Sequence, residues 1–217
     1  MLPNPLSLDQ GWGVGEEAFG RIVEQLRAIG ARTIVEFGSG ISSVRLALEF
    51  PDAQIVSIES SREWYETVQR MRTEHGLEKT LTVEHRPLRW QRHGLAFFLS
   101  YAPGELPERI DAVIIDGPPT WTRRGREACL YQVVRRLRVG GRVVLDDYGR
   151  NREKTMVRNW TWSFPGLFAM STIPAGHGLC VLEKLRETRR ARPSWRAWPD
   201  HFIEVLGVLL THPLRRE

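Results

Sequence analysis

One short segment constrains the fold of this chain more than any other. Residues 33–43 read Thr-Ile-Val-Glu-Phe-Gly-Ser-Gly-Ile-Ser-Ser, which is a β-branched apolar run, a Gly-x-Gly turn and a helix start. The apolar run has the pattern of a buried strand. Glycines let a ligand lie against bare backbone, and the N-terminus of the next helix favours anionic or polar ligand groups. The segment therefore predicts the first strand, turn and helix of a βαβ unit with a nucleotide-cofactor pocket.

The residues around this turn narrow the choice of cofactor. A dinucleotide fingerprint, G-x-G-x-x-G, would place its third glycine where this chain has Ser43. Glu36 suits a cationic cofactor that carries an amino acid better than it suits a pyrophosphate. Glu59 ends the next apolar run about 20 residues after Gly38, and a carboxylate at that spacing can accept both hydroxyls of a ribose. A plain tight turn followed by a solvated carboxylate is the alternative interpretation.

Strand and helix patterns alternate along most of the chain. This alternation predicts an α/β fold with a mostly parallel sheet and helices on both faces. A loop-rich stretch is expected from 86 to 109, and a closing hairpin from 168 to 185. We expect helices at about 16–29, 42–50, 62–75, 124–138 and 151–162, and strands before Gly38 and at 54–59, 80–85, 111–116, 142–146, 168–173 and 179–185.

The glycine turn and its acids resemble motif I of the class I S-adenosylmethionine (SAM)-dependent methyltransferases. The resemblance covers residues 16–185 and implies a doubly wound, Rossmann-like, three-layer αβα fold. Its mostly parallel sheet would have seven strands, the last of them antiparallel, and its cofactor would be SAM. The cofactor contacts implied by the resemblance are Glu36, Gly38, Ser39, Gly40, Glu59, Ser60, His85, Leu88, Asp116 and Trp121.

Acids also end the fourth and fifth expected strands, at Asp116 and at Asp146-Asp147. Ligands of open α/β sheets bind beyond the carboxyl ends of the strands, so these acids should face the pocket. The positions are similar to the metal ligands of catechol and caffeoyl-CoA O-methyltransferases, which implies possible Mg²⁺ binding by all three. Asp147 replaces the Asn of that pattern, however, and Pro119 replaces its lysine.

A metal-free alternative is equally open. In it Asp116 fixes the cofactor and Asp147 acts as the catalytic base or as an anchor for the substrate. The Asp-Gly-Pro-Pro and Asp-Asp-x-x-Arg patterns more closely resemble a broad group of bacterial class I methyltransferases of small or unassigned substrates. We therefore expect SAM-dependent methyl transfer to a small molecule, most simply to a hydroxyl oxygen. An RNA methyltransferase, or a nucleotide-cofactor binder without methyl transfer, is the alternative.

Composition and charge limit which partners and which cellular location we expect. The chain has 217 residues, is 41% hydrophobic and carries a net charge of +5. Its arginines are scattered and lack the aromatic-basic motif of a known RNA module, so we do not expect a nucleic-acid partner. The sequence shows neither a signal peptide nor an apolar run long enough to span a membrane, and we expect a cytoplasmic protein. Its two cysteines are expected to be core residues.

Residues 186–217 are expected to lie outside the methyltransferase-like domain of residues 1–185. This tail is basic, contains Trp195 and Trp198, and ends in a short apolar helix. The apolar residues of this helix form a wide stripe. A stripe of this kind more often packs on the body of the protein or on a second copy than on a membrane. A peripheral contact with an anionic membrane is the alternative. The apolar stripe consists of Phe202, Ile203, Val205, Leu206, Leu209 and Leu210.

Overall fold

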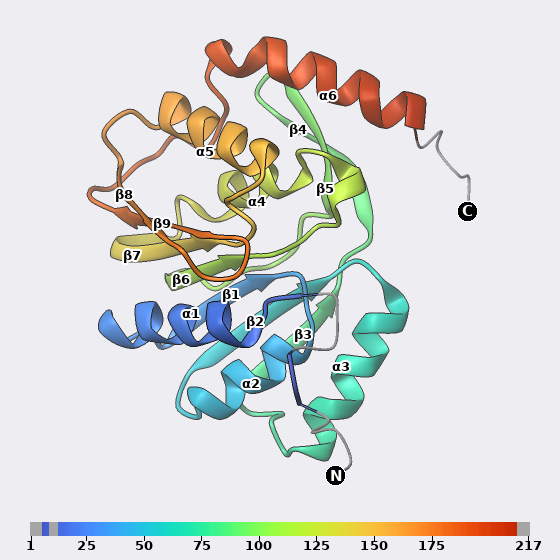
Figure 1. The fold of residues 1–217 in the computed structure, drawn as a ribbon, viewed down its shortest axis with the longest axis vertical. Coiled ribbons are helices and arrows are strands. Elements are labelled where there is room, and N and C mark those ends of the chain that lie inside the picture. Colours follow the sequence, from blue (N-terminus) through green and yellow to red (C-terminus); the bar gives the residue numbers. More distant parts are fainter. Residues whose placement is uncertain (1–5, 9–12, 212–217) are drawn as a thin grey trace.

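The computed structural model describes residues 6–8 and 13–211 and confirms a three-layer α/β fold (Figure 1). The helices of the two outer layers are α1 (Glu16–Ala28), α2 (Ile41–Glu49) and α3 (Arg62–Glu74) on one face, and α4 (Gly125–Val133) and α5 (Asn151–Ser163) on the other. The strands of the central sheet are β1 (Thr33–Phe37), β2 (Gln54–Glu59), β3 (Leu81–His85), β6 (Ile110–Ile115), β7 (Leu137–Leu145), β8 (Phe168–Ile173) and β9 (Leu179–Lys184).

The sheet has the order β3-β2-β1-β6-β7-β9-β8. The five neighbouring strands β3, β2, β1, β6 and β7 are parallel to one another, whereas β9 is antiparallel to both β7 and β8. The expected seven-stranded sheet with an antiparallel last strand is therefore confirmed. The chain crosses from β1 outward to β3 and then returns to β6 on the other side of β1. In open α/β sheets, ligands bind where the strand order reverses in this way. Here that place is at the ends of β1 and β6.

Two apolar cores lie on the two faces of the sheet. Side chains of a strand alternate between the faces, so neighbouring residues of β1 contribute to different cores. Ile34 joins the core under α1, α2 and α3, whereas Val35 joins the core under α4 and α5. Both are fully buried. The sheet is thus a rigid, doubly covered platform that fixes where its strands end.

The expectation of a loop-rich stretch from 86 to 109 was wrong. This stretch forms β4 (Leu88–His93) and β5 (Ala96–Tyr101), an antiparallel pair apart from the main sheet. A tight turn joins the strands, with Gly94 in the left-handed region at φ 64°. Arg89 and Arg92 are exposed and lie on opposite faces of β4, so the strand lacks an alternating apolar pattern in the sequence.

Helix α4 and strand β7 also differ from the expectation. The helix ends at Val133, and β7 begins at Leu137, several residues before position 142. Leu137 pairs with Ile110, and the pairing with β6 then shifts register before Arg142 meets Ala112. The Gly140-Gly141 pair lies in this irregular part, which makes the first half of the strand read as a turn in the sequence.

The tail adds the short turn η2 (Trp195–Ala197) and helix α6 (Trp198–Thr211), which lies along one edge of the molecule in Figure 1. Helix α6 packs against β5. We expected its wide apolar stripe to pack on the body of the protein or on a second copy, and most of the stripe does not pack on the body. Val205 is half-buried, but the other members of the stripe are exposed, because the helix docks through a different face that carries His201 and Val208. Among residues 6–8 and 13–211, no helix is long and apolar enough to cross a membrane.

Candidate functional site

Strand register brings the predicted site residues to one edge of the sheet. Phe37 at the end of β1 lies opposite Ile58 of β2 and Ile115 of β6, and Ile115 lies opposite Leu145 of β7. The residues that follow these positions therefore gather where the parallel strands end. They are Gly38 after β1, Glu59 on β2, Asp116 after β6, and Asp146 and Asp147 after β7.

Gly38 brings two of these loops into direct backbone contact. Its φ of 103° is a conformation that side-chain-bearing residues rarely adopt. A Cβ at Gly38 would lie 2.8 Å from the backbone nitrogen of Gly117, in the loop after β6. A Cβ at Gly117 would in turn lie 2.9 Å from the Gly38 Cα and closer still to the hydroxyl of Tyr101. Neither position can accept a side chain without moving the other loop.

Glu59 lies beside this turn and orders it. The Ser39 backbone N–H donates to its Oε2 at 3.1 Å, and the N–H groups of Ser60 and Ser61 donate to Oε1 at 2.7 and 2.6 Å. Burial raises the pKa of Glu59, while these hydrogen bonds oppose the rise. The Ser60 hydroxyl also donates to Oε1 at 3.3 Å, whereas Oε2 accepts from Ser39 alone among the described residues and can still accept a hydroxyl group of a ligand. The structure thus brings Gly38, Ser39, Glu59 and Ser60 together.

Glu36 occupies a different position, inside the protein. It is buried and accepts hydrogen bonds from the hydroxyls of Ser42 at 2.8 Å and Ser57 at 2.7 Å, and also from Ser43. Burial raises its pKa to about 7, although the serine hydroxyls lower it. Ser43 Oγ also accepts from the Gly40 N–H at 3.1 Å. Glu36 therefore supports the glycine turn from behind, through Ser43 and Gly40.

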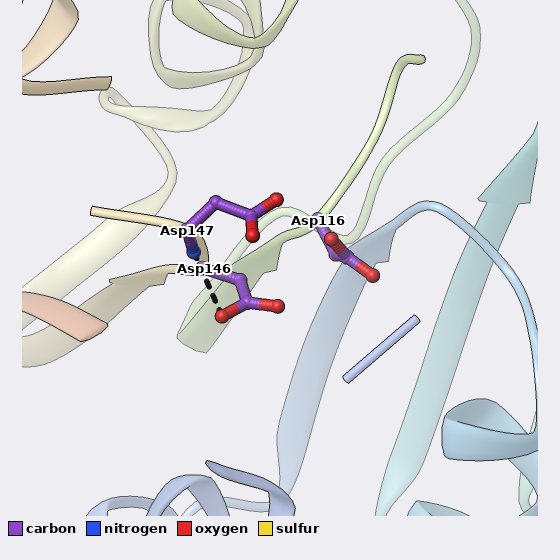
Figure 2. A group of neighbouring side chains, drawn as sticks. All are labelled: Asp116, Asp146 and Asp147. Carbon is purple, nitrogen blue, oxygen red and sulfur yellow. Dashed lines mark hydrogen bonds between the residues drawn. The ribbon is translucent and has the colours of Figure 1, made fainter. Parts of the chain in front are cut away.

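The three aspartates form one cluster (Figure 2). One carboxylate oxygen from each of Asp116, Asp146 and Asp147 lies within 4.8 Å of the others. The pKa of Asp146 is raised to about 7, chiefly by burial and also by the nearby charges of Asp116 and Asp147. Burial, followed by the charge of Asp147, also raises the pKa of Asp116, against the lowering effect of Arg126. Asp147 has a φ of 61°, which an Asp tolerates better than most residues.

Arg126, at the start of α4, supplies a buried positive charge to this cluster. Its Nη1 donates to Asp147 Oδ2 at 2.9 Å, its Nη2 lies 3.4 Å from Asp116 Oδ1, and Nη1 lies 3.8 Å from Glu153 Oε1. Arg150 adds an ion pair of 2.6 Å with Asp147. An all-oxygen donor set is what Mg²⁺ prefers. Here, however, Arg126 and Arg150 already pair with Asp147, and Arg126 also lies beside Asp116, so the residues do not fit a resident divalent cation.

Three further predicted residues lie around the edge of this region. His85 is exposed, its Nε2 lies 3.1 Å from the Ser60 carbonyl oxygen, and its ring lies 5.7 Å from that of Tyr65. Leu88 is half-buried at the start of β4 and packs on the core. Trp121 is exposed in the short turn η1 (Thr120–Thr122), which follows the loop after β6.

Sequence reasoning missed the position of Arg126. Arg123, Arg124 and Arg126 all follow Asp116 in the sequence, and the pattern does not single out the one that enters the acid cluster. Arg124 turns away and pairs with Glu127, while Arg123 pairs with Glu204 of the tail. Arg123 and Arg124 precede α4 and Arg126 lies in its first turn, so the spacing of the three arginines does not show which one reaches the acids.

No protein-family model and no curated protein matches this sequence. Solved structures do match its fold. They include the O-methyltransferase TomG of Streptomyces achromogenes, involved in tomaymycin synthesis and solved with SAM, at 19% identity and TM-score 0.57, covering 77% of this chain and 79% of that one. The SAH-bound methyltransferase PaMTH1 of Podospora anserina matches at 13% identity and TM-score 0.58, with coverage of 77% and 78%.

A third match is the precorrin-6y C5,15-methyltransferase of Geobacter metallireducens, at 14% identity and TM-score 0.59, covering 82% of this chain and 92% of that one. At such low identities the similarity shows a shared fold. The neighbours' names include both an O-methyltransferase and a methyltransferase that acts on precorrin carbons. The fold alone does not identify the acceptor of a methyl group, which has to be argued from the residues of the site.

Proposed function

We propose that this protein transfers a methyl group from SAM to a hydroxyl oxygen of a small molecule, without a divalent metal ion. The observation that carries the proposal is the backbone contact between Gly38 and Gly117. It places the glycine turn and Glu59 directly beside the cluster of acids and Arg126. One half of the site then has the groups that a nucleoside cofactor needs, and the other half has groups that handle a proton and a negative charge.

The cofactor half is formed by the ends of β1 and β2. Glycine at position 38 keeps the backbone bare, and Glu59 offers its carboxylate to the hydroxyls of a ribose. Asp116 adds negative charge near a cationic ligand, and Glu36 supports the glycine turn from behind. When bound, SAM supplies an electrophilic methyl group on a positively charged sulfur. Solved neighbours that hold SAM or SAH support this choice of cofactor.

The acceptor half is formed by the ends of β6 and β7. Among the three aspartates, Asp116 has the most exposed side chain, at 20% against 8% for Asp147, and its raised pKa suits a proton acceptor near neutral pH. Asp116 would take the proton of the acceptor hydroxyl. The hydroxyl oxygen would bond to the methyl carbon as the carbon–sulfur bond breaks, the sulfur would keep that electron pair, and SAH would leave. Arg126 holds Asp147 and can stabilise the negative charge that develops on the oxygen. Asp147 orients Arg126.

An RNA acceptor is the second candidate, because the chain carries a net charge of +5. The distribution of that charge favours a small acceptor. Arg123, Arg124 and Arg126 follow the loop after β6, yet each is engaged with an acid of the protein itself. They are therefore not available as a patch for a phosphate backbone.

Titration calorimetry with SAM, SAH and NAD tests the cofactor. We expect SAM and SAH to bind and NAD not to bind. Glu59→Ala should weaken SAM binding by roughly 10- to 100-fold, since losing a charge-assisted contact costs about 1.5–3 kcal/mol. The matched control is Glu63→Ala, because Glu63 is an exposed acid in the first turn of α3. Equal losses in both variants, or no SAM binding by the wild type, would contradict the proposal.

Transfer of a radiolabelled methyl group to a panel of hydroxylated small molecules and to bulk RNA tests the acceptor. Activity on a small molecule should persist in EDTA, because Arg126 provides the positive charge. Asp116→Asn should abolish turnover while leaving SAM affinity within a few-fold. Activity that EDTA removes and Mg²⁺ restores would show that the carboxylates act as metal ligands instead.

A further inference from the structure

An ordinary surface helix turns its apolar side toward the protein, whereas α6 turns its large apolar side chains away from it. The side that faces the protein carries its polar groups: His201 Nε2 lies 3.1 Å from Glu127 Oε1, Glu204 pairs with Arg123 at 3.0 Å, and Asp200 pairs with Arg158 at 2.6 Å. The side that faces away carries its large apolar groups. The members of this outer face are Trp198, Phe202, Ile203, Leu206, Leu209 and Leu210.

The outer face is continuous and uncharged. At 3.6 residues per turn, its six side chains fall within an arc of about 140°. The two acids of α6 lie outside that arc, and each is neutralised by an arginine of the body of the protein. Phe202 and Leu210 are each 73% exposed. A contiguous apolar surface of this kind marks an interaction site.

Positive charge is concentrated in the segment that leads into α6. Between α6 and the end of β9, the chain carries exposed arginines and one acid, Glu187, which pairs with Lys184. Arg192 lies against Gly94 at the tip of the β4–β5 hairpin, next to the exposed Leu95. The exposed arginines of this basic segment are Arg186, Arg189, Arg190, Arg192 and Arg196.

We propose that the outer face of α6 and the basic segment dock this protein on the surface of an anionic lipid bilayer. The apolar arc would enter the boundary between headgroups and acyl chains, while the arginines meet the phosphates. Trp195, 79% exposed with Arg196 over its ring, and Trp198 lie at the end of α6 beside the basic segment. Indole rings favour the headgroup level, where one end is apolar and the other is wet.

A second copy of this chain fits the outer face less well. Protein interfaces carry about one hydrogen bond per 100–200 Å². Within the arc, the Trp198 indole N–H is the one side-chain hydrogen-bond donor. Two copies would also bring two basic segments together, and like charges oppose each other. A lipid surface needs no hydrogen-bonding partner in the arc and is complementary to the arginines.

Co-sedimentation of the full chain with phosphatidylcholine vesicles, with and without phosphatidylglycerol, tests this docking. We expect binding to the anionic vesicles that weakens with added salt and weak binding to the neutral ones. Leu206→Glu should reduce binding at least tenfold. Leu48→Glu is the matched control, because Leu48 is 46% exposed on α2 and Leu206 is 48% exposed on α6.

The docking does not depend on methyl transfer, so its failure leaves the proposed function standing. Circular dichroism of both variants confirms that they are folded. Absence of vesicle binding by the wild type, or equal losses in the two variants, overturns the proposal. So does a dimer in analytical ultracentrifugation that Leu206→Glu dissociates, since the outer face would then be an interface between copies.

Discussion

Arg126 decides the chemistry that the acid cluster can perform. Its side chain is 7% exposed and lies among the carboxylates of Asp116, Asp147 and Glu153. Taking a charged group out of water is costly unless opposite charges and hydrogen bonds compensate it, and here the acids and the arginine compensate each other. Removing the arginine should therefore leave a buried site of uncompensated negative charge.

Arg126→Met should convert the cluster into a divalent-cation site. We expect this variant to have a lower melting temperature than the wild type, and Mg²⁺ or Ca²⁺ to restore several degrees of it. The wild type should show no such shift, because its own guanidinium competes with the ion. Arg126→Lys is the control, since it keeps the positive charge and should gain no response. A wild-type melting temperature that rises with Mg²⁺ and falls with EDTA would contradict this view.

Asp146 should make stability depend on pH. Burial raises its pKa from 3.8 to about 7, so the folded state keeps a proton that the unfolded state has released. Its contribution to stability is therefore present below pH 4 and is lost as pH rises through 7. Asn cannot ionise, so Asp146→Asn should gain roughly 1–3 kcal/mol over the wild type between pH 5 and pH 8.

Urea unfolding of both proteins at the two pH values measures this gain. Glu36 also has a pKa raised to about 7, but it is present in both proteins, so its effect cancels in the comparison. A stability difference between Asp146→Asn and the wild type that does not change with pH would contradict the assignment.

The sequence predicted which residues gather at the site, but not how their charges are balanced. Glycine spacing and strand ends identified Gly38, Glu59 and the three aspartates, because strand register is set by local pattern. The burial of Glu36 behind serine hydroxyls and the insertion of Arg126 depend on how helices approach the sheet. Such long-range contacts leave no signature in residue spacing.

Among the helices and strands, α6 shows how a short apolar helix can be held by polar contacts. Glu127 of α4 is fully buried and accepts hydrogen bonds from Arg124, from Tyr131 at 3.1 Å and from His201 at 3.1 Å. Burial lowers the pKa of His201 to about 3, so its ring is neutral and donates through Nε2. This network ties the tail to the domain. Removing its acid leaves Arg124 buried without a partner.

Glu127→Ala should therefore lower the free energy of unfolding by about 3–5 kcal/mol, the usual cost of breaking a buried ion pair. It should also expose the basic segment to trypsin. Glu204→Ala is the comparison, because the half-exposed pair of Glu204 and Arg123 should contribute no more than about 1 kcal/mol. Equal effects of the two changes on unfolding and on cleavage would show that Glu127 does not anchor α6.

The elements that the sequence missed share a physical reason. The β4–β5 pair lies outside the main sheet, and α6 packs on β5 and is tied to α4 by the contact between His201 and Glu127. In β4 exposed arginines interrupt the strand pattern, and in α6 the apolar stripe faces outward, so neither pattern shows how its element packs. Elements that are covered on both sides, such as β1 and β2, carry mostly apolar runs and were predicted within a residue or two.

At the scale of the whole molecule, the fold followed from the order of patterns. Alternating strands and helices predict a parallel sheet, and the closing hairpin predicts the antiparallel β9. Right-handed crossovers leave few ways to arrange such a chain. The acceptor could not be predicted in the same way, because the loops and the β4–β5 pair around the site do not repeat any regular pattern.

The contact between Gly38 and Gly117 has one consequence for the history of this chain. Two loops that meet backbone to backbone have no side chain through which they can adjust independently. A descendant that acquires a side chain at one glycine must displace the opposite loop, and with it the partner half of the site. We therefore expect the two positions to change together among distant relatives, even where the acceptor loops have diverged freely.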